Sequence, residues 1–202
     1  MGIQLRHGPH RGRLVIPCDH SYARDGGRSG PADQDGSHVI YSDDHGRTWR
    51  LGGVARPEMN ESQVIELADG QGGLLLNMRT VASHQRRAQS VSHDGGLTWT
   101  PPEPVAELVE PRCQASLVRS QWPGSNGPGR LLFSNPAGPK RTRLTLRVST
   151  DDGRTWPVAR VLHEGPAAYS CLAVLPANAV GVLYECGEKK AYEKIVFEKA
   201  KS

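Results

Sequence analysis

One eight-residue pattern recurs three times and constrains the fold of this chain more than any other feature. The three copies are SDDHGRTW, SHDGGLTW and STDDGRTW, at residues 42–49, 92–99 and 149–156. Each copy reads S-x-D-x-G-x-T-W, and chance does not account for three matches to a five-residue pattern. A repeat of about fifty residues predicts a chain built from similar structural units that stack side by side.

The repeated pattern is typical of a tight turn between two antiparallel strands. An extended run leads into its serine, and its aspartate is suited to accept hydrogen bonds from backbone N–H groups of the turn. Gly46, Gly96 and Gly153 supply the positive φ that such a turn needs. We expect the threonine and tryptophan to begin the returning strand and the tryptophan ring to pack against the neighbouring repeat. The pattern is therefore interpreted as structural and not as catalytic.

The remainder of each repeat predicts an all-β fold. Two extended runs separated by a turn follow each tryptophan, and no helical periodicity is present. The chain holds 23 glycines and 15 prolines among 202 residues, a share that disfavours a helical bundle. Four strands in about fifty residues is typical of a β-propeller blade. We predict one domain over residues 1–202, with about three and a half four-stranded blades.

The chain opens in the middle of a unit, because residues 12–19 match the second extended run of a repeat. A propeller covers its sheet faces only when its blades close into a ring. Three and a half blades would leave such faces open. The favoured explanation is that the sequence is part of a longer polypeptide, and the alternative is self-association through the open blade edges.

Composition excludes several classes of function. The net charge is +4, yet aromatic residues make up only 5% of the chain, which disfavours nucleic-acid binding. No apolar run has the length of a membrane-spanning helix. Residues 1–18 lack the apolar core of a signal peptide, so the sequence assigns no compartment.

Cysteine and histidine spacing gives no support for a metal site, and no cofactor is predicted. The cysteines show no CxxC pair, and the eight histidines show no ligand spacing. We expect reduced, partly buried thiols, with two disulfides as the alternative. The lysine-rich C-terminal segment is interpreted as an edge strand.

The triple pattern resembles the Asp box of the sialidase superfamily, and four further blocks strengthen the resemblance. Residues 60–80 look like the segment that supplies a glutamate and an arginine to the active site, and residues 139–156 resemble the segment with the next arginine. Residues 165–175 are similar to the segment with the nucleophilic tyrosine, and residues 183–187 resemble the end of the last blade. The blocks correspond in order to the second half of a six-bladed exo-α-sialidase.

The resemblance implies roles for six residues. Tyr169 would be the nucleophile and Glu61 its general base. The other four would bind or orient the substrate: Arg79 and Arg141 as members of a carboxylate-binding triad, Glu185 as the partner of the third arginine, and Gln114 as a sugar contact. Independently, Glu61, Cys113 and Tyr169 lie 12, 14 and 13 residues after their tryptophans. We therefore expect them at the start of the same strand in successive blades, converging on one end of a central channel.

These residue types suit the chemistry of a sialic acid. Its anomeric carbon bears a carboxylate, which a planar guanidinium holds with two charge-assisted hydrogen bonds. A carboxylate nucleophile would be repelled by this charge, whereas a neutral tyrosine is not, provided that a nearby carboxylate takes its proton. Sialidases are the known exception among glycosidases in using tyrosine, and retention of configuration is expected.

The family's first triad arginine and its acid/base aspartate have no match. Residues 11–17 contain a string similar to the family's RIP motif, but their place predicts an ordinary blade strand. Asp33 and Asp35 are weak candidates for the acid. The resemblance thus implies an incomplete and impaired hydrolase whose partners are sialylated oligosaccharides, glycoproteins and glycolipids. The alternatives are a non-catalytic sialic-acid-binding propeller and a purely structural one.

Overall fold

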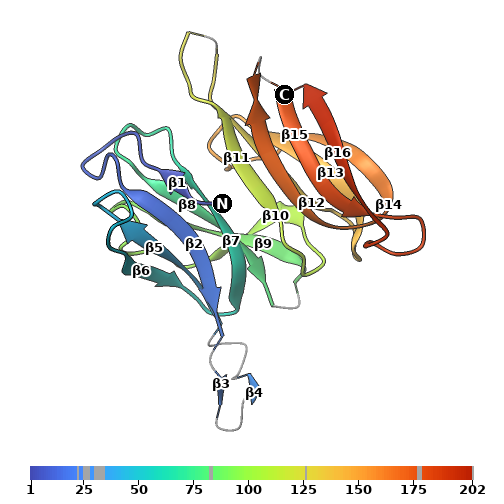
Figure 1. Cartoon of the computed structure of the whole chain (residues 1–202), viewed down its shortest axis with the longest axis horizontal. Coiled ribbons are helices and arrows are strands. Elements are labelled where there is room, and N and C mark those ends of the chain that lie inside the picture. The colour runs from blue at the N-terminus through green and yellow to red at the C-terminus, as the bar shows by residue number, and fades with distance from the viewer. Residues whose placement is uncertain are drawn as a thin grey trace. The chain divides into compact units, whose positions relative to one another are not determined.

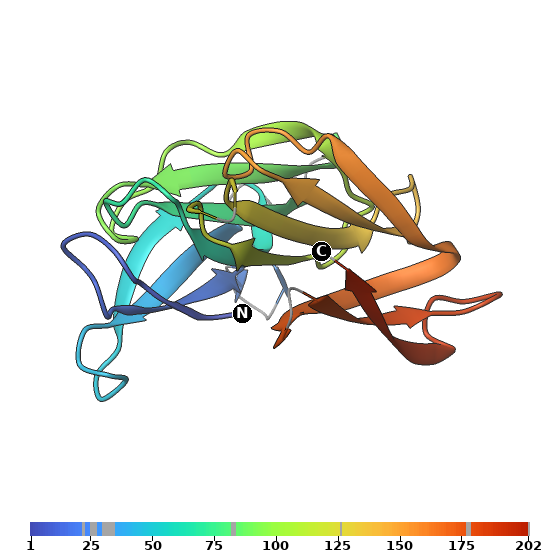
Figure 2. The ribbon, with the colours of Figure 1, turned by 90° about the horizontal axis from the view of Figure 1, so that it is seen from above.

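The computed structural model consists of antiparallel sheets whose order can be followed in Figures 1 and 2. It describes residues 1–21, 23–24, 28–29, 35–81, 84–125, 127–176 and 179–201. No α-helix occurs in these ranges. The chain divides into two compact units, Met1–Val105 and Ala106–Ser202. The prediction of a single domain over residues 1–202 stays a prediction.

The first unit contains two four-stranded sheets. In spatial order the first is β1 (Ile3–Gln4), β2 (Leu14–His20), β5 (Gly36–Ser42) and β6 (Arg50–Ala55). The second is β10 (Glu103–Val109), β9 (Arg86–Ser92), β8 (Leu74–Thr80) and β7 (Met59–Glu66), and β10 continues past the end of the unit. A small ribbon of β3 (Ala23–Arg24) and β4 (Arg28–Ser29) follows β2.

The second unit contains a six-stranded sheet that comprises one four-stranded blade and part of another. Its strands are β11 (Ser116–Gln121), β12 (Arg130–Pro136), β13 (Thr142–Ser149), β14 (Val158–Leu175), β15 (Ala179–Cys186) and β16 (Lys194–Lys201). The 18-residue β14 belongs to both, because it pairs with β13 as far as Pro166 and with β15 from Ala167. The fold is thus all-β and built from the four-stranded antiparallel sheets of propeller blades, as predicted.

Each unit has its own core, formed by alternate residues of its strands. In the first unit, β2 and β5 pack against β7, and the buried side chains come from both sheets: Leu5, Val15, Val39, Tyr41, Ala55, Met59, Val64, Leu74, Leu76, Met78 and Ala88. In the second unit, Leu132, Leu144, Leu172, Val180 and Val182 are fully buried. Burial of these side chains supplies the main force that holds the blades together.

The three Asp boxes form the predicted turns with nearly identical geometry. In each, the serine hydroxyl donates to the aspartate at 2.8, 2.8 and 2.7 Å, and the threonine hydroxyl donates to the other carboxylate oxygen at 2.6 Å. The glycine N–H donates to the serine oxygen at 2.8, 2.9 and 2.9 Å. The glycines have φ of 85°, 94° and 85°, as expected. These contacts make the boxes structural elements.

The three tryptophans behave differently, so the prediction that each packs on its neighbour is only partly right. The Trp99 indole donates to Gly53 of β6 at 3.1 Å, which joins the two sheets of the first unit. Trp49 instead donates within its own turn, to Gly46, and is 41% exposed. Trp156 is buried against Phe133 of its own sheet. Each tryptophan also precedes the returning strand, which was expected to include it.

Close approach between sheets explains a pair of glycines in β6. The N–H of Gly53 donates to the carbonyl of Gly96 in the second Asp box at 2.8 Å. A Cβ atom on Gly52 would lie 2.5 Å from that same carbonyl oxygen. Any larger residue at position 52 would therefore separate the turn from the strand on which it rests.

Candidate active site

Glu61 lies at a β-bulge between β7 and β8. Met59 pairs with Thr80 and Ser62 with Met78, so Asn60 and Glu61 together oppose the single residue Arg79. The Arg79 guanidinium donates to the Glu61 carboxylate at 2.7 Å, and both side chains are partly buried. A bulge turns side chains away from regular alternation and is common beside active sites. The structure thus joins two of the predicted site residues in an ion pair.

Tyr169 lies at a bulge of the same kind between β14 and β15. Ala167 pairs with Cys186 and Ser170 with Tyr184, so Ala168 and Tyr169 oppose Glu185. The Tyr169 backbone N–H donates to the Glu185 carboxylate at 3.1 Å.

Glu61 and Tyr169 therefore occupy the same position in their blades, as their spacing from the tryptophans predicts. Arg79 and Glu185 share the opposing position. The prediction that Cys113 starts the equivalent strand is only partly right, since Cys113 lies buried in the segment just ahead of β11.

Arg141 faces Tyr169 from the segment that leads into β13. Its guanidinium carbon lies 5.6 Å from the centre of the Tyr169 ring. Its two terminal nitrogens donate to the Tyr192 hydroxyl at 2.5 Å and to the Arg112 carbonyl at 2.9 Å. Tyr192 was not predicted as a site residue, because a tyrosine in a lysine-rich C-terminal segment gives no signal of its own.

Arg141 remains a cation in this setting. Partial burial alone would lower its pKa, but the Cys113 sulfur, the Tyr192 hydroxyl and the Tyr169 phenol more than offset this effect, and the pKa of Arg141 is raised. A fixed positive charge beside the phenol stabilises negative charge that develops on its oxygen.

Gln114 holds the strand next to Tyr169. Its side-chain oxygen accepts a hydrogen bond from the Ser170 N–H at 3.1 Å, and its side-chain nitrogen donates to the Ala115 carbonyl at 2.8 Å. The amide is thus committed to the backbone of the protein. A contact from Gln114 to a sugar stays a prediction.

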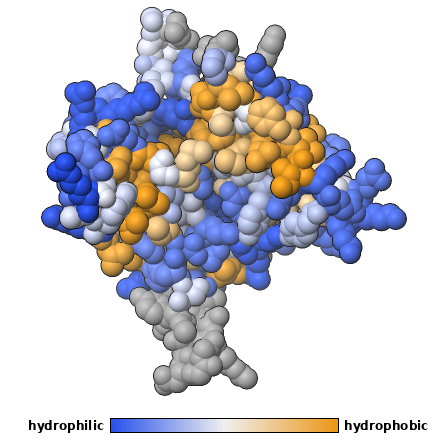
Figure 3. Space-filling model, in the orientation of Figure 1, coloured by the Kyte–Doolittle hydropathy of each residue, from blue (hydrophilic) through white to orange (hydrophobic). Residues whose placement is uncertain are grey.

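A cavity of about 340 Å³ opens beside the phenol of Tyr169, which is 38% exposed. This volume is at the lower end of the range for small-molecule sites. The residues that line it come from β14, β15, β16 and the segment before β11: Gln114, Tyr169, Ser170, Cys171, Leu183, Tyr184, Glu185 and Ile195. Part of the apolar area in the upper half of Figure 3 lies over these C-terminal strands.

The predicted site residues form two groups, one in each unit. Glu61 and Arg79 belong to Met1–Val105, and Tyr169, Arg141, Gln114 and Glu185 belong to Ala106–Ser202.

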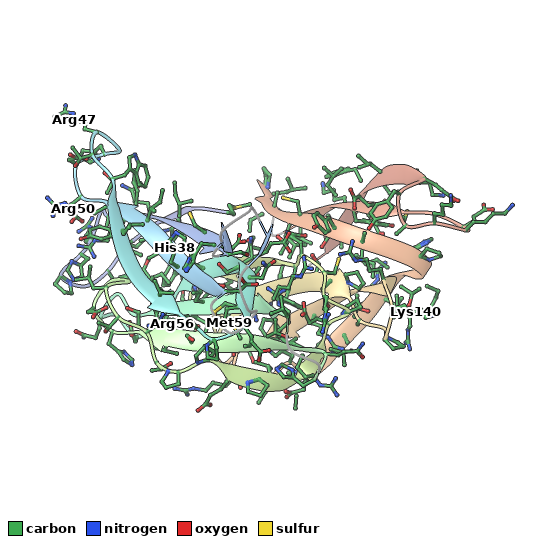
Figure 4. All side chains as sticks on the ribbon, turned by 90° about the horizontal axis from the view of Figure 1, so that it is seen from below. His38, Arg47, Arg50, Arg56, Met59 and Lys140 are labelled. Carbon is green, nitrogen blue, oxygen red and sulfur yellow. The ribbon has the colours of Figure 1, made fainter. Side chains whose placement is uncertain are left out.

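Asp19 is a site candidate that sequence reasoning missed. It lies near the end of β2 and receives a hydrogen bond of 3.5 Å from the Asn60 amide, next to Glu61. Burial and the negative charge of Glu61 raise its pKa, and His38, His20 and Arg79 oppose the shift. Figure 4 labels His38 on β5. Alignment of residues 12–19 with residues 72–79 places Asp19 at the position of Arg79, and this signal could have identified it.

The other acid candidates and the RIP-like string can be placed only in part. Asp33 lies outside the described residues, whereas the Asp35 carbonyl accepts a hydrogen bond from the Met59 N–H at 3.2 Å. The string at residues 11–17 leads into β2, and its Arg13 is 5% exposed and paired with Asp43 at 2.7 Å. This string is therefore part of an ordinary blade strand, as predicted.

Over the described ranges, no three His, Cys, Asp or Glu side chains are grouped as metal ligands. A search of the same ranges finds no helix of the length and apolarity needed to span a membrane. All four cysteines are free thiols, in agreement with the favoured prediction.

Comparison with known proteins agrees with this architecture. The model of the BNR repeat-like domain family matches residues 3–182. A sialidase of Micromonospora viridifaciens is 42% identical over 190 residues, which are 92% of this chain and 28% of that protein. Mouse Sialidase-3 is 31% identical, and the match covers 97% of this chain and 56% of the relative.

Solved structures give the same result. A Hadza microbial sialidase superposes with a TM-score of 0.78 at 35% identity, over 99% of this chain and 36% of that one. An intramolecular trans-sialidase of Ruminococcus gnavus, at 24% identity and a TM-score of 0.75, shares the fold. The chain spans about a quarter to a half of the length of the relatives named here. The chain belongs to the BNR repeat-like domain family, and its named relatives are sialidases.

Proposed function

We propose that the protein acts as a sialidase-type glycoside hydrolase that releases terminal sialic acids from oligosaccharides, glycoproteins and glycolipids. The observation that carries the proposal is the setting of Tyr169: an exposed phenol at a bulge, beside a cavity, with the Arg141 guanidinium 5.6 Å from its ring. The family membership and the names of the relatives support the same reaction class.

In the proposed reaction, the Tyr169 oxygen attacks the anomeric carbon while the bond to the leaving sugar breaks. Glu61 takes the phenol proton, and a proton from a general acid goes to the leaving oxygen. Water then attacks the anomeric carbon from the face that the leaving sugar vacated and gives a proton to the conjugate base of the general acid. The glycosyl–tyrosine bond breaks and the phenol regains its proton from Glu61, so the two displacements together retain the configuration. The assignment of Tyr169 as nucleophile and Glu61 as base follows the resemblance.

Arg79 and Arg141 are proposed to bind the carboxylate of the sialic acid. Each guanidinium offers paired N–H donors that match two carboxylate oxygens. Arg79 is already oriented by Glu61 and Arg141 by the Arg112 carbonyl and Tyr192, so less conformational entropy is lost on binding. Glu185 is proposed to orient a further arginine.

Hydrolysis of a fluorogenic aryl sialoside tests the proposal. We expect slow turnover by the unmodified chain, because the family's first triad arginine and acid/base aspartate have no match in it, with retention of configuration by NMR and a loss of at least a hundredfold in Tyr169→Phe. Tyr41→Phe removes a hydroxyl from a core tyrosine that no step uses, and it should retain the unmodified rate. Equal rates for Tyr169→Phe and the unmodified chain would refute the tyrosine mechanism. Binding of sialic acid without turnover would support the non-catalytic alternative.

A further inference from the structure

The strand register of the repeats identifies an equivalent position in successive blades. Leu14 of β2 and Leu74 of β8 each pair with the first serine of the Asp box that follows them. Five residues further along these strands stand Asp19 and Arg79, which therefore occupy equivalent positions. Because Glu185 opposes the equivalent bulge in the last blade, it shares this position too.

The equivalent strand β12 helps to show what is special about Asp19. Its Leu131 pairs with the serine of the third Asp box, so the equivalent residue is Pro136, which offers no side-chain polar group. The fold therefore does not require a polar residue at this position. Where it is polar, the side chain contacts a candidate site residue, as Arg79 contacts Glu61 and Glu185 contacts Tyr169.

Asp19 also lies within reach of the Glu61–Arg79 pair. The Asn60 amide donates to its carboxylate at 3.5 Å, and Asn60 shares the β-bulge with Glu61. The charges of Glu61 and Arg79 both act on the Asp19 carboxylate: Glu61 raises its pKa and Arg79 lowers it. Asp19 keeps more of its surface in solvent than the partly buried Glu61 does, although neighbouring groups partly desolvate its carboxylate. A carboxylate that is exposed and adjacent to the pair is placed to touch a bound molecule.

The neighbouring histidines are engaged with each other. The Nδ1 atoms of His20 and His38 lie 3.0 Å apart, so one ring donates to the other. Burial and the charge of His20 lower the pKa of His38. A carboxylate has about four acceptor sites on its two oxygens, and the hydrogen bond from Asn60 uses one of those on Asp19.

We propose that Asp19 contacts the bound sugar acid and accepts a hydrogen bond from one of its hydroxyl groups, so that the site prefers a free hydroxyl to an O-acylated one. The inference rests on the proposed function. A hydroxyl donates to a carboxylate, whereas an ester at the same oxygen has no proton to donate and leaves the carboxylate desolvated without a partner.

Calorimetric binding of N-acetylneuraminic acid and of its mono-O-acetylated forms, each acetylated at one hydroxyl, tests this role. We expect the unmodified chain to bind the parent acid about tenfold more tightly than at least one acetylated form. Asp19→Ala should weaken binding of the parent about tenfold and abolish this preference, and Asp19→Asn should retain part of it. Glu103→Gln, which changes an exposed carboxylate of β10, is the matched control and should bind as the unmodified chain does.

The outcomes separate the two proposals. Equal parent affinity and an unchanged preference in Asp19→Ala would overturn the role of Asp19 while the proposed function stands. Failure of the unmodified chain to bind the parent acid would overturn the proposed function and this inference with it. Thermal unfolding of each variant checks that the fold is retained, and Asp19→Asn, which keeps the shape of the side chain, gives a second reading if Asp19→Ala is unstable.

Discussion

At the scale of single residues, two β-bulges decide which side chains leave the regular alternation of the strands. Glu61 and Tyr169 each share such a bulge with a neighbour, opposite Arg79 and Glu185 respectively. Motif resemblance predicted these four residues, but the bulges themselves have no signature in the sequence. Asp19 was missed because no family motif covers it, although the aligned repeats place it at the position of Arg79.

The ion pair of Arg79 leads to a prediction about binding. Arg79→Lys keeps the positive charge but replaces a planar fork by a single ammonium group, which cannot hold a carboxylate with two parallel hydrogen bonds. We expect affinity for N-acetylneuraminic acid to fall about tenfold or more, as measured by calorimetry. Arg86→Lys, at an exposed-side position of β9 outside the site, serves as the control. Unchanged affinity in Arg79→Lys would remove Arg79 from the proposed carboxylate site.

At the scale of elements, the Asp box turns explain why three different sequences give one hairpin. Serine, aspartate, glycine and threonine form a closed set of hydrogen bonds within each turn, so this geometry could be predicted from sequence. The tryptophan environments could not, because each depends on a different neighbour. Likewise, fully buried Arg87 and partly buried Arg79 look alike in sequence, and the hydrogen bond of Arg87 to Asn77 marks Arg87 as structural.

The second Asp box predicts a loss of stability in acid. Burial alone would raise the pKa of Asp94, but hydrogen bonds from Thr98, Ser92 and Leu97 hold the pKa at about 2, below the ordinary value of 3.8. A depressed folded-state pKa contributes stability above the ordinary pKa, and this contribution is lost as the pH falls towards 2.

The melting temperature of the unmodified chain should therefore fall between about pH 4 and pH 2. Asp94→Asn should melt lower at pH 7 and lose less on acidification. Glu103→Gln removes an exposed carboxylate outside the turn and is therefore the control for the loss of one negative charge. Parallel melting curves for Asp94→Asn and the unmodified chain across this pH range would contradict the role assigned to the turn.

At the scale of the whole molecule, the spacing of the repeats predicted the number and kind of blades. It did not predict that one strand is shared between two blades. The 18-residue β14 passes from one blade into the next without a break, and its pairing changes from β13 to β15 between Pro166 and Ala167. The C-terminal segment was correctly predicted as an edge strand, since β16 pairs only with β15 among the described strands.

The apolar face of the C-terminal strands leads to a prediction about self-association. Leu183, Ile195 and Phe197 are 47%, 69% and 62% exposed, and Leu183 lies beside Phe197 in the register. Apolar groups gathered on a sheet face favour contact with another surface. We expect association that increases with concentration in sedimentation velocity and is weakened in Phe197→Thr. Lys199→Thr, on the same strand, is the control for a change in β16 that removes no apolar side chain, and it should associate as the unmodified chain does. A monomer at every concentration would contradict the prediction.

The two bulges also bear on how such a chain acquires new chemistry. A bulge interrupts the regular ladder, so strand pairing constrains the side chain there less than it constrains its neighbours. The equivalent position holds a carboxylate in one blade and a phenol in another. Different chemical groups can therefore occupy this position in successive blades, while the Asp boxes keep the frame.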